Sequence, residues 1–599
     1  MIDAYKQNIK HWIERSQFRL AGPDALLQLA VLGLLTGVIT GAVIVLFRLL
    51  VEESQDLLLP GSGSEGYERL SLGARFLFPV VSGLLLAFLY YKYSKGIRVL
   101  GIARVMERMA YHQGYMTIRG FCIQFVGAAV AIIGGHSVGR EGPHVYLGGA
   151  AGSLFGQYLK LPNNSIRTLV ASGVAAAIAA SFNTPLAGVI FALEVIMMEY
   201  TLASFVPVML AAVSGTAVSN IVLGSAPAFG IPEVAIASFA EFPIIILLGL
   251  VVGAVAALFN QMLETISIKA KTIEIWWRLI IAGIILAFIG LLVPEVLGIG
   301  YDTVNATMFG AYSIFMLLGL LIAKLLATSV CIGLGVPGGM IGPAFFMGAL
   351  IGASVSFIAV YFFGADASDV GFYTLLGMGA MVGACLQAPL AALTAIMELT
   401  YNPGIILPGM LTIVIAQLTA SVVFKKESLF VSMLRNNGLD YDISPAMQVL
   451  RGIGVASILD NQFIRVAPNI TRQNAKLLVA EDQQYHWVLI NDDAGNLSTL
   501  MPISELAKFL QTTSQGVVEL KEDMGDEDEF NLLEIPANRM QLSPLALQAN
   551  LQQAHEKFLQ GAEVLFVVFN EEQSLDKTPS NIRIYGVVTR NMVDASYKV

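Results

Sequence analysis

Long runs without a charged residue constrain the fold of this chain more than any other feature. A membrane-spanning helix needs about 20 predominantly apolar residues, because each residue advances it by roughly 1.5 Å. The charge-free runs cover residues 29–47, 242–263, 279–294, 303–323, 325–365, 370–397 and 399–424. Several of these cross a bilayer once, and the longest must turn back within it. Glycine and proline interrupt the longest runs, so we predict an all-α polytopic membrane domain with re-entrant, broken helices.

Composition and the first residues agree with a membrane protein. Hydrophobic residues make up 56% of the 599 residues and charged residues only 13%, which is too few for a soluble surface. The N-terminus lacks the short apolar segment and cleavage site of a signal peptide. Basic residues precede the first run, and such flanks favour the cytoplasm. We expect a cytoplasmic N-terminal helix at residues 1–23, both termini in the cytoplasm, and a multi-pass protein of the cell inner (plasma) membrane.

Beyond Lys425 the composition changes to that of a small soluble module. Segments such as "HWVLINDD" and "AEVLFVVFNEE" predict short strands, each followed by a helical pattern. We therefore expect a membrane domain at 24–435, a linker at 436–454, and two α/β repeats at 455–511 and 535–599. An acidic linker at 512–534 contains "KEDMGDEDEF". The net charge of −9 arises largely from the C-terminal part, including this stretch, and says little about a ligand.

Two halves of the membrane domain share one sequence plan. The stretch "GREGPHVYLGGAAG" aligns with "GMIGPAFFMGALIG", which lies 200 positions later. Further on, "SGVAAAIAASFNTPLAGVIFALE" aligns with "LGMGAMVGACLQAPLAALTAIME", which pairs Glu194 with Glu398. Membrane proteins with internal repeats commonly place their substrate site where the repeats meet, between the ends of broken helices.

The Gly-Pro breaks predict an anion site. A glycine-rich turn followed by Gly-Pro and an apolar stretch is typical of a helix start, because proline is tolerated in the first turn. The first N–H groups of such a helix are free, and the helix dipole adds roughly half a positive charge. If residues 139–143 face residues 338–343, two converging helix ends form a desolvated cage for a small anion.

Glu141 and Arg140 lie beside this expected cage. The carboxylate of Glu141 can enter the anion position and leave it when protonated or displaced, so that it acts as a proton-sensitive gate. The alternative is that Glu141 only caps a helix. For Arg140 we expect a structural pairing with a carboxylate elsewhere, because a bare arginine in an anion pathway would trap the ion.

The motifs "GREGP" and "PGGMIGP", with the two "PLAG/PLAA…E" segments, resemble the CLC family of chloride channels and chloride/proton exchangers across nearly the whole membrane domain. The resemblance implies inverted repeats, voltage gating, a homodimer with one pore in each subunit, and the role of external gating glutamate for Glu141. It places the anion-binding backbone of the two motifs at Gly139, Arg140, Gly142, Gly339, Met340 and Ile341.

Two positions depart from the family pattern at the central anion site. The first pore motif of the family, Gly-Ser-Gly-Ile-Pro, matches best at "VLGIA", where Gly101 and Ile102 agree but Leu100 replaces the serine. Phe430 stands where a tyrosine is expected. Each missing hydroxyl removes a hydrogen bond worth about 0.5–1.5 kcal/mol. Central binding should therefore depend on backbone amides and be weaker.

A third departure concerns protons. Exchangers of the family carry an inward glutamate immediately after the position of Glu194, and here that residue is Val195. Glu194 is the remaining candidate, with Glu141, for a proton pathway, although a carboxylate at this helix end more often has a structural role. These changes favour passive or loosely proton-coupled chloride transport, and the alternative is a strictly coupled chloride/proton antiporter. Lys324, between two charge-free runs, either snorkels to an interface or attracts anions at the inner mouth.

The C-terminal segments resemble a pair of CBS domains. The turn "GVVTRNM" keeps the glycine and threonine that often hold an adenine nucleotide, Gly586 and Thr589, but has Met592 in place of the aspartate. Ser504 in "TLMPISEL" lacks the preceding glycine. A structural, dimerising role is favoured, with nucleotide sensing as the alternative. We expect chloride, the bilayer and a second copy as partners, with no nucleic acid.

Other function classes fit less well. An intramembrane hydrolase needs a nucleophile with its base, and a metalloenzyme needs clustered ligands such as a His-Glu-x-x-His helix, which the sequence lacks. The three cysteines form no disulfide or metal pattern. We therefore expect no enzymatic activity, no metal and no cofactor. A nucleotide sensor with a simple membrane anchor would not need the polar helix breaks. Nitrate, bromide and fluoride remain alternatives to chloride.

Overall fold

The computed structural model describes residues 20, 25–60, 66–94, 101–199, 201–225, 229–230, 236–364, 367–439, 445–480, 485–491, 497–514, 527–569 and 583–596. The chain divides into a larger unit, Leu26–Tyr158 with Ile166–Asp442, and a smaller unit, Met1–Ala25 with Leu159–Ser165 and Ile443–Val599. Nearly all of the N-terminal helix predicted at 1–23 falls outside the described residues, and so does Leu100.

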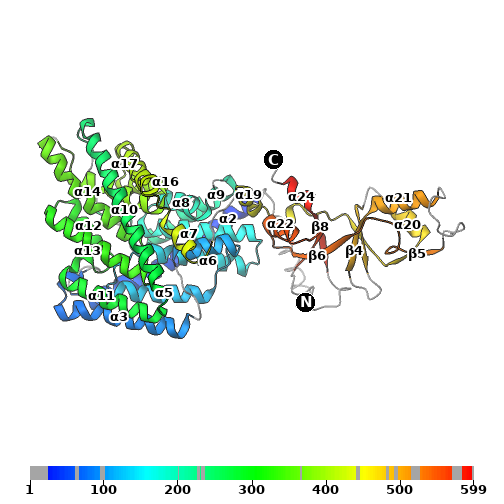
Figure 1. The fold of residues 1–599 in the computed structure, drawn as a ribbon, viewed down its shortest axis with the longest axis horizontal. Helices are drawn as coiled ribbons and strands as arrows, with labels where there is room; N and C mark the ends of the chain where they lie inside the picture. Colours follow the sequence, from blue (N-terminus) through cyan, green and yellow to red (C-terminus); the bar gives the residue numbers. More distant parts are fainter. Residues whose placement is uncertain are drawn as a thin grey trace. The chain divides into compact units, whose positions relative to one another are not determined.

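The described part of the larger unit is helical throughout (Figure 1). Its α-helices are α2 (Leu26–Leu58), α3 (Leu72–Tyr93), α4 (Ile102–Tyr111), α5 (Ile118–Ile133), α6 (Glu141–Tyr158), α7 (Asn163–Phe182), α8 (Pro185–Phe191), α9 (Leu202–Leu223), α10 (Phe242–Ala270), α11 (Ile275–Leu292), α12 (Tyr301–Met308), α13 (Ile314–Gly333), α14 (Ile341–Phe363), α15 (Val370–Leu386), α16 (Pro389–Thr400), α17 (Ile406–Leu418) and α18 (Leu429–Asn436). Short single turns are η1 (Gly66–Arg69), η3 (Phe239–Glu241), η4 (Pro294–Val296) and η6 (Pro403–Ile405), and η2 (Ala192–Met197) and η7 (Thr419–Val423) are π-helical.

Nine helices among the described residues are long and apolar enough to cross a membrane. Shorter apolar helices, including α5, α15 and α16, lie between them in the chain. Proline is the first residue of both α8 and α16, where it needs no hydrogen-bond partner for its nitrogen. The prediction of a polytopic all-α membrane domain with broken helices is therefore confirmed.

Matching glycines bring matching helices of the two halves into close contact. A Cβ at Gly148 of α6 would lie 2.3 Å from the carbonyl oxygen of Gly173 in α7. In the second half, a Cβ at Gly348 of α14 would lie 2.3 Å from the carbonyl oxygen of Gly377 in α15. Only a residue without a side chain allows these backbones to approach so closely. The sequence repeat thus corresponds to a repeat in packing.

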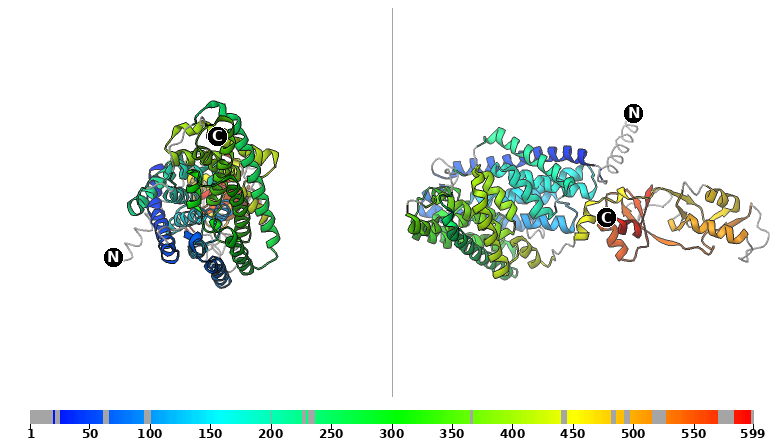
Figure 2. Two further views of the ribbon diagram at one scale, coloured as in Figure 1. Left: turned by 90° about the vertical axis from the view of Figure 1, so that its left-hand side faces the viewer. Right: turned by 90° about the horizontal axis from the view of Figure 1, so that it is seen from above.

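The smaller unit contains all the described strands (Figure 2). They are β1 (Phe463–Val466), β2 (Asn469–Thr471), β3 (Trp487–Asn491), β4 (Leu497–Pro502), β5 (Glu529–Asn531), β6 (Met540–Ala546), β7 (Val564–Val568) and β8 (Ile584–Thr589). Six form one sheet in the order β1-β3-β4-β6-β7-β8, with β1/β3 and β6/β7 parallel and the other pairs antiparallel. Each half therefore has one parallel and one antiparallel pair, and Phe463 opposite Trp487 sets the register of the first.

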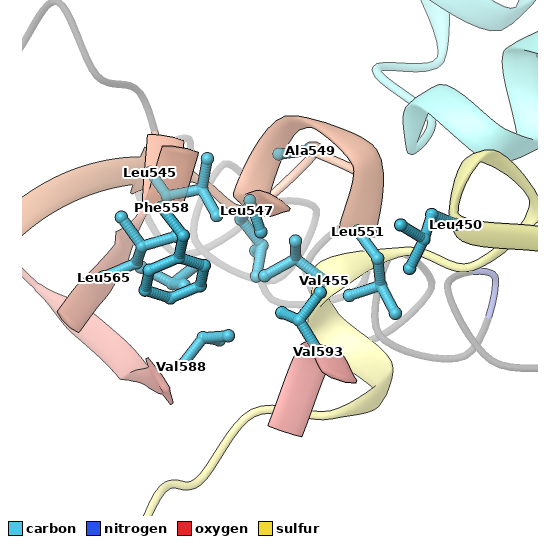
Figure 3. Packing of buried hydrophobic residues seen from close by; sticks show 12 residues of the cluster. Leu450, Val455, Leu545, Leu547, Ala549, Leu551, Phe558, Leu565, Val588 and Val593 are labelled. Carbon is cyan, nitrogen blue, oxygen red and sulfur yellow. The ribbon is translucent and has the colours of Figure 1, made fainter. Parts of the chain in front are cut away.

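Helices α19 (Pro445–Gly452), α20 (Arg472–Ala480), α21 (Ile503–Ser514), α22 (Leu551–Leu559) and α24 (Arg590–Ala595), with the single turn η8 (Val455–Ser457), complete this unit. Leu450 and Val455 belong to the buried cluster formed with α22, α24 and the sheet (Figure 3). The segment 436–454 is therefore more than the linker that we predicted, because α19 contributes to a core. The acidic linker predicted at 512–534 is also wrong in part, because β5 pairs with β2.

Packing explains the nucleotide-like turn of the second repeat. A Cβ at Gly586 would lie 2.8 Å from the carbonyl oxygen of Asp460, whose backbone pairs with Val587. Thr589 caps α24 together with Met592, whose sulfur accepts the N–H of Thr589 at 3.4 Å. Both Gly586 and Thr589 thus have structural tasks within this unit.

Candidate functional site

The two Gly-Pro breaks meet. Gly139 and Gly339 form an antiparallel bridge in which each N–H donates to the other residue's carbonyl, at 2.7 and 2.6 Å. Helix α6 starts at Glu141 and α14 at Ile341, so both N-termini lie at this crossing. A Cβ at Gly142 would lie 2.6 Å from the Cα of Gly339. The positive ends of two helix dipoles therefore converge on one small volume, as the repeat predicted.

Glu141 is fully buried at this crossing. Its Oε2 accepts the backbone N–H of Gly342 at 3.1 Å, and its Oε1 accepts the hydroxyl of Tyr301. The carboxylate therefore lies on the N-terminus of α14, which belongs to the opposite repeat, rather than on that of its own helix α6. A negative group at this place gains from both the free N–H and the helix dipole. Any small anion would gain from the same groups if the carboxylate left.

Arg140 makes the structural pairing that we expected. Its Nη1 lies 3.1 Å from Oε1 of Glu52 near the end of α2, and Arg48 donates to the same oxygen at 3.1 Å. The guanidinium also lies over the ring of Tyr301, at 5.3 Å from the ring centroid. The positive charge of Arg140 is therefore directed at Glu52 and an aromatic face.

A cavity of about 260 Å³ lies against the crossing. This volume leaves room for an ion with several water molecules. The cavity brings together six of the predicted anion-binding residues, namely Gly101, Ile102, Gly142, Gly339, Met340 and Phe430. Gly139, Arg140, Glu141 and Ile341 are not among its lining residues. Ile341 instead lines a small apolar pocket of about 40 Å³ with Phe182 and Phe345.

Two cations on the cavity wall were missed from the sequence. Lys271 and Arg278 both line the cavity, with Asn436 and Asn437 of the α18 segment. The ammonium of Lys271 donates to the carbonyl oxygen of Asn436. These charges raise the electrostatic potential in the cavity and so attract anions. The signal that could have found them is the basic stretch "KAKTIEIWWR" between two charge-free runs.

Glu194 and Glu398 form a reciprocal pair of helix caps. Glu194 in η2 accepts the N–H groups of Leu390 and Ala391 at 3.2 and 2.7 Å, at the start of α16. Glu398 in α16 accepts the N–H groups of Leu186 and Ala187 at 2.9 and 2.7 Å, at the start of α8. Each carboxylate thus satisfies orphan donors of the other repeat. The geometry gives Glu194 the structural task that was one of its two expected roles.

The buried surroundings of Lys324 fit neither of its two expected roles. Its side chain is fully buried in α13, and it is not among the residues that line the 260 Å³ cavity. The ammonium donates to three carbonyl oxygens of the turn before α12, those of Val296, Gly298 and Ile299, at 3.1–3.2 Å. Tyr301 follows this turn, and sequence reasoning missed it although "GIGYD" has the glycines of a tight turn.

A curated relative matches much of the chain. The H(+)/Cl(−) exchange transporter ClcA of Yersinia pestis bv. Antiqua (strain Angola) is 28% identical over 401 residues, which are 65% of this chain and 84% of the relative. Among solved structures, a slow cyanobacterial Cl−/H+ antiporter covers 68% of this chain and 97% of its own, with 21% identity and a TM-score of 0.61.

A second solved structure extends the likeness in fold to the smaller unit. A eukaryotic CLC transporter covers 94% of this chain and 98% of its own, with 19% identity and a TM-score of 0.58. The family model described as "Voltage gated chloride channel" matches residues 82–421, which are more than half of the chain. With both helix breaks of the crossing inside that match, this chain belongs to the voltage-gated chloride channel, or CLC, family.

Proposed function

We propose that this protein carries chloride across a membrane along a pathway that Glu141 gates. The observation that supports this most is the carboxylate of Glu141 on the N-terminus of α14, beside the Gly139–Gly339 crossing. The carboxylate of Glu141 is itself an anion. Its position therefore marks a place where a permeating anion can bind once the carboxylate leaves. The named activity of the Yersinia relative supports chloride as that anion.

Central binding should be weak and should depend on backbone groups. Phe430 is buried on the cavity wall and has no hydroxyl to donate. The polar groups on the cavity wall include the backbone around Gly339, the cations Lys271 and Arg278, and the side chains of Ser267, Asn436 and Asn437. Long-range attraction by these cations concentrates anions without desolvating them fully, which favours rapid release.

We propose that coupling to protons is loose or absent. Val195, at the inward glutamate position of the family, is buried and cannot carry a proton. Glu194 accepts two backbone N–H groups at the start of α16, and this capping role supports loose coupling. Strict chloride/proton exchange is the second candidate, and the exchanger name of the Yersinia relative favours it.

Anion flux with simultaneous pH recording separates the two candidates. Purified protein in liposomes loaded with chloride should release it when a potassium ionophore sets the membrane potential. With loose coupling, we expect little uphill proton movement driven by the chloride gradient. Sustained uphill movement in a fixed ratio to chloride would instead establish the exchanger.

A substitution of Glu141 tests the gate separately from the transport. Glu141→Gln keeps the shape and the acceptor for Gly342 but removes the charge, so we expect chloride flux that no longer depends on pH. A wild-type protein with no chloride-dependent flux would contradict the proposed transport itself. A Glu141→Gln variant with an unchanged pH response would contradict the gate alone.

We further propose that the smaller unit is a CBS pair that serves assembly into a homodimer in the cell membrane, with both termini in the cytoplasm. The repeated strand and helix order supports the CBS assignment. The structural tasks of Gly586 and Thr589 speak for assembly rather than nucleotide sensing. An unchanged thermal midpoint with millimolar ATP or AMP, together with a dimer mass in detergent, is the expected result.

A further inference from the structure

In its closed position, the carboxylate of Glu141 accepts hydrogen bonds from two donors of different kinds. The N–H of Gly342 belongs to the anion site itself and stays there when the carboxylate leaves. The hydroxyl of Tyr301 comes from outside that site, from the first residue of α12. A donor that binds only the closed position of a gate stabilises that position over the open one.

Packing leaves the hydroxyl of Tyr301 little freedom. Its side chain is buried, with the residue 8% exposed. The ring of Phe229 lies at 4.7 Å between centroids, and the guanidinium of Arg140 lies over the Tyr301 ring at 5.3 Å. The ring of Phe182 lies further away, at 6.5 Å. The phenol is therefore held between an aromatic group and a cation, and aimed at Glu141.

The turn before Tyr301 is tethered by a buried cation. Gly298 and Gly300 have φ angles of +66° and +86°, which other residues rarely adopt. The ammonium of Lys324 gathers three carbonyl oxygens of this turn and lies 4.5 Å from the ring centroid of Phe346. A buried charge persists only when such partners compensate its lost hydration. The N–H of Gly298 also donates to Gly135, in the turn after α5, at 2.9 Å.

We propose that Tyr301 is a positioning residue that latches Glu141 in its closed place, and that Lys324 holds the turn that presents the latch. This inference rests on the proposed function of Glu141 as a gate. A hydrogen bond to a charged group contributes more than one between neutral groups, and its loss should raise the open population about tenfold or more. Because the phenol donates better to the charged carboxylate, its removal should also let protons open the gate at higher pH.

The isosteric variant Tyr301→Phe tests the latch. We expect chloride flux at pH 7 to rise about tenfold in liposomes, and the pH of half-maximal flux to move up by about one unit, which is the same factor of ten. The matched control is Tyr373→Phe, because Tyr373 is another buried tyrosine whose hydroxyl donates to a buried carboxylate, that of Glu241. This control should leave both quantities unchanged.

The pH readout depends on keeping other ionisable groups unchanged. The substitution alters no titratable group except the phenol itself. The charged and titratable groups near the gate include Arg48 and Arg140, which both pair with Glu52. The others are His144, which is hydrogen-bonded to Ser181, Asp302, which follows Tyr301 in the chain, and Lys324.

A double variant separates a latch from a general packing effect. In a Glu141→Ala background there is nothing to latch, so Tyr301→Phe should change the flux no further. A flux gain that persists in that background would overturn the proposal, and so would Tyr301→Phe with the flux and pH profile of the wild type. Absence of chloride flux in the wild type would instead contradict the proposed function, so the two failures are distinguishable.

The role of Lys324 in the latch is tested by combining its variants with Tyr301→Phe. Lys324→Met should raise flux in the same direction as Tyr301→Phe but add nothing in a Tyr301→Phe background, because both act on the same hydrogen bond. Lys324→Arg keeps a buried cation with donors and should restore most of the wild-type profile. A gain from Lys324→Met that adds fully to that of Tyr301→Phe would remove Lys324 from the latch. If Lys324→Met does not fold, a change of the pH profile by Lys324→Arg that adds fully to that of Tyr301→Phe would have the same consequence.

Discussion

At the scale of single residues, the site depends on glycines, which have no side chain, as much as on the carboxylate of Glu141. Gly139, Gly142 and Gly339 lie so close together that none of the three positions has room for a side chain. Their backbones therefore supply the donors, and the only carboxylate at the crossing among the described residues is Glu141. A positively charged side chain at the crossing would bind an anion more tightly but would also hold it longer.

A methyl group at the crossing should disrupt it. In Gly339→Ala the new Cβ would lie 2.4 Å from the nitrogen of Gly142, so the helix ends must move apart. Misplaced donors should lower chloride flux at least about tenfold. The control is Gly319→Ala in α13, where a Cβ meets nothing within 4 Å. It should keep wild-type flux and raise stability by up to about 1 kcal/mol. Equal flux in both variants would contradict the importance of the close approach.

At the scale of elements, the two repeats complete each other. Helices α8 and α16 each start with proline and leave orphan N–H groups, which a glutamate from the other repeat accepts. The same exchange occurs at the crossing, where Glu141 of α6 occupies the start of α14. At these three helix starts the acceptor comes from the other repeat, so each half completes helix ends of the other.

Reciprocal caps allow a test with an internal control. Glu194→Gln and Glu398→Gln should each lower the free energy of unfolding by about 0.5–2 kcal/mol, because each removes a charged acceptor from a helix start. Thermal midpoints in detergent measure this loss. Any proton movement of the wild type should persist in both variants. Loss of proton movement in Glu194→Gln but not in Glu398→Gln would place Glu194 in a proton pathway.

At the scale of the whole molecule, the chain combines an apolar helical unit with a small α/β unit that closes on itself. Asp460, before β1, pairs its backbone with Val587 of β8, at 2.9 and 3.1 Å. Its carboxylate accepts the N–H of Gln462 at 2.9 Å, Nδ1 of His486 at 2.8 Å and the indole N–H of Trp487 at 2.9 Å. This one residue therefore joins the first strands to the last.

The ionised form of Asp460 should stabilise the smaller unit. Burial by itself raises the pKa of this carboxyl, but the donors from Gln462, His486 and Trp487 outweigh it, and the net pKa lies below the ordinary value. The stabilisation is thus complete above the unfolded value of about 3.9 and is lost as pH falls through the lower folded value. Asp460→Asn should cost about 1–3 kcal/mol at pH 7.

Proteolysis of the full chain in increasing urea measures this cost, with cleavage scored in the smaller unit. The control is Asp594→Asn, which removes a more exposed carboxylate 3.9 Å from Arg590 and should change stability by less than about 1 kcal/mol. The difference between Asp460→Asn and the wild type should shrink near pH 3. A difference as large at pH 3 as at pH 7 would show that charge is not the cause.

The sequence by itself determined the class of fold and the place of the site. Charge-free runs require helices in a bilayer, because an unpaired backbone is too costly there. The Gly-Pro breaks and the 200-residue repeat indicated which helix ends meet, and Glu141 was recognisable because a carboxylate is rare in such a setting. The strands at Trp487–Asn491 and Val564–Val568 in the smaller unit were also recognisable from their apolar segments, although each is followed by a second strand before the next helix.

Only the tertiary structure decided which groups from distant segments meet Glu141 and what Lys324 binds. Tyr301 lies 160 positions from Glu141 in the chain, and no local periodicity links the two. Lys324 looked like an interfacial or attracting charge because hydropathy describes a run but not the carbonyls that a fold brings to it. The linkers were misjudged for the same reason, since β5 exists only through its pairing with β2. Local patterns fix where a helix starts, whereas a hydrogen bond needs two positions in space, and those come from packing.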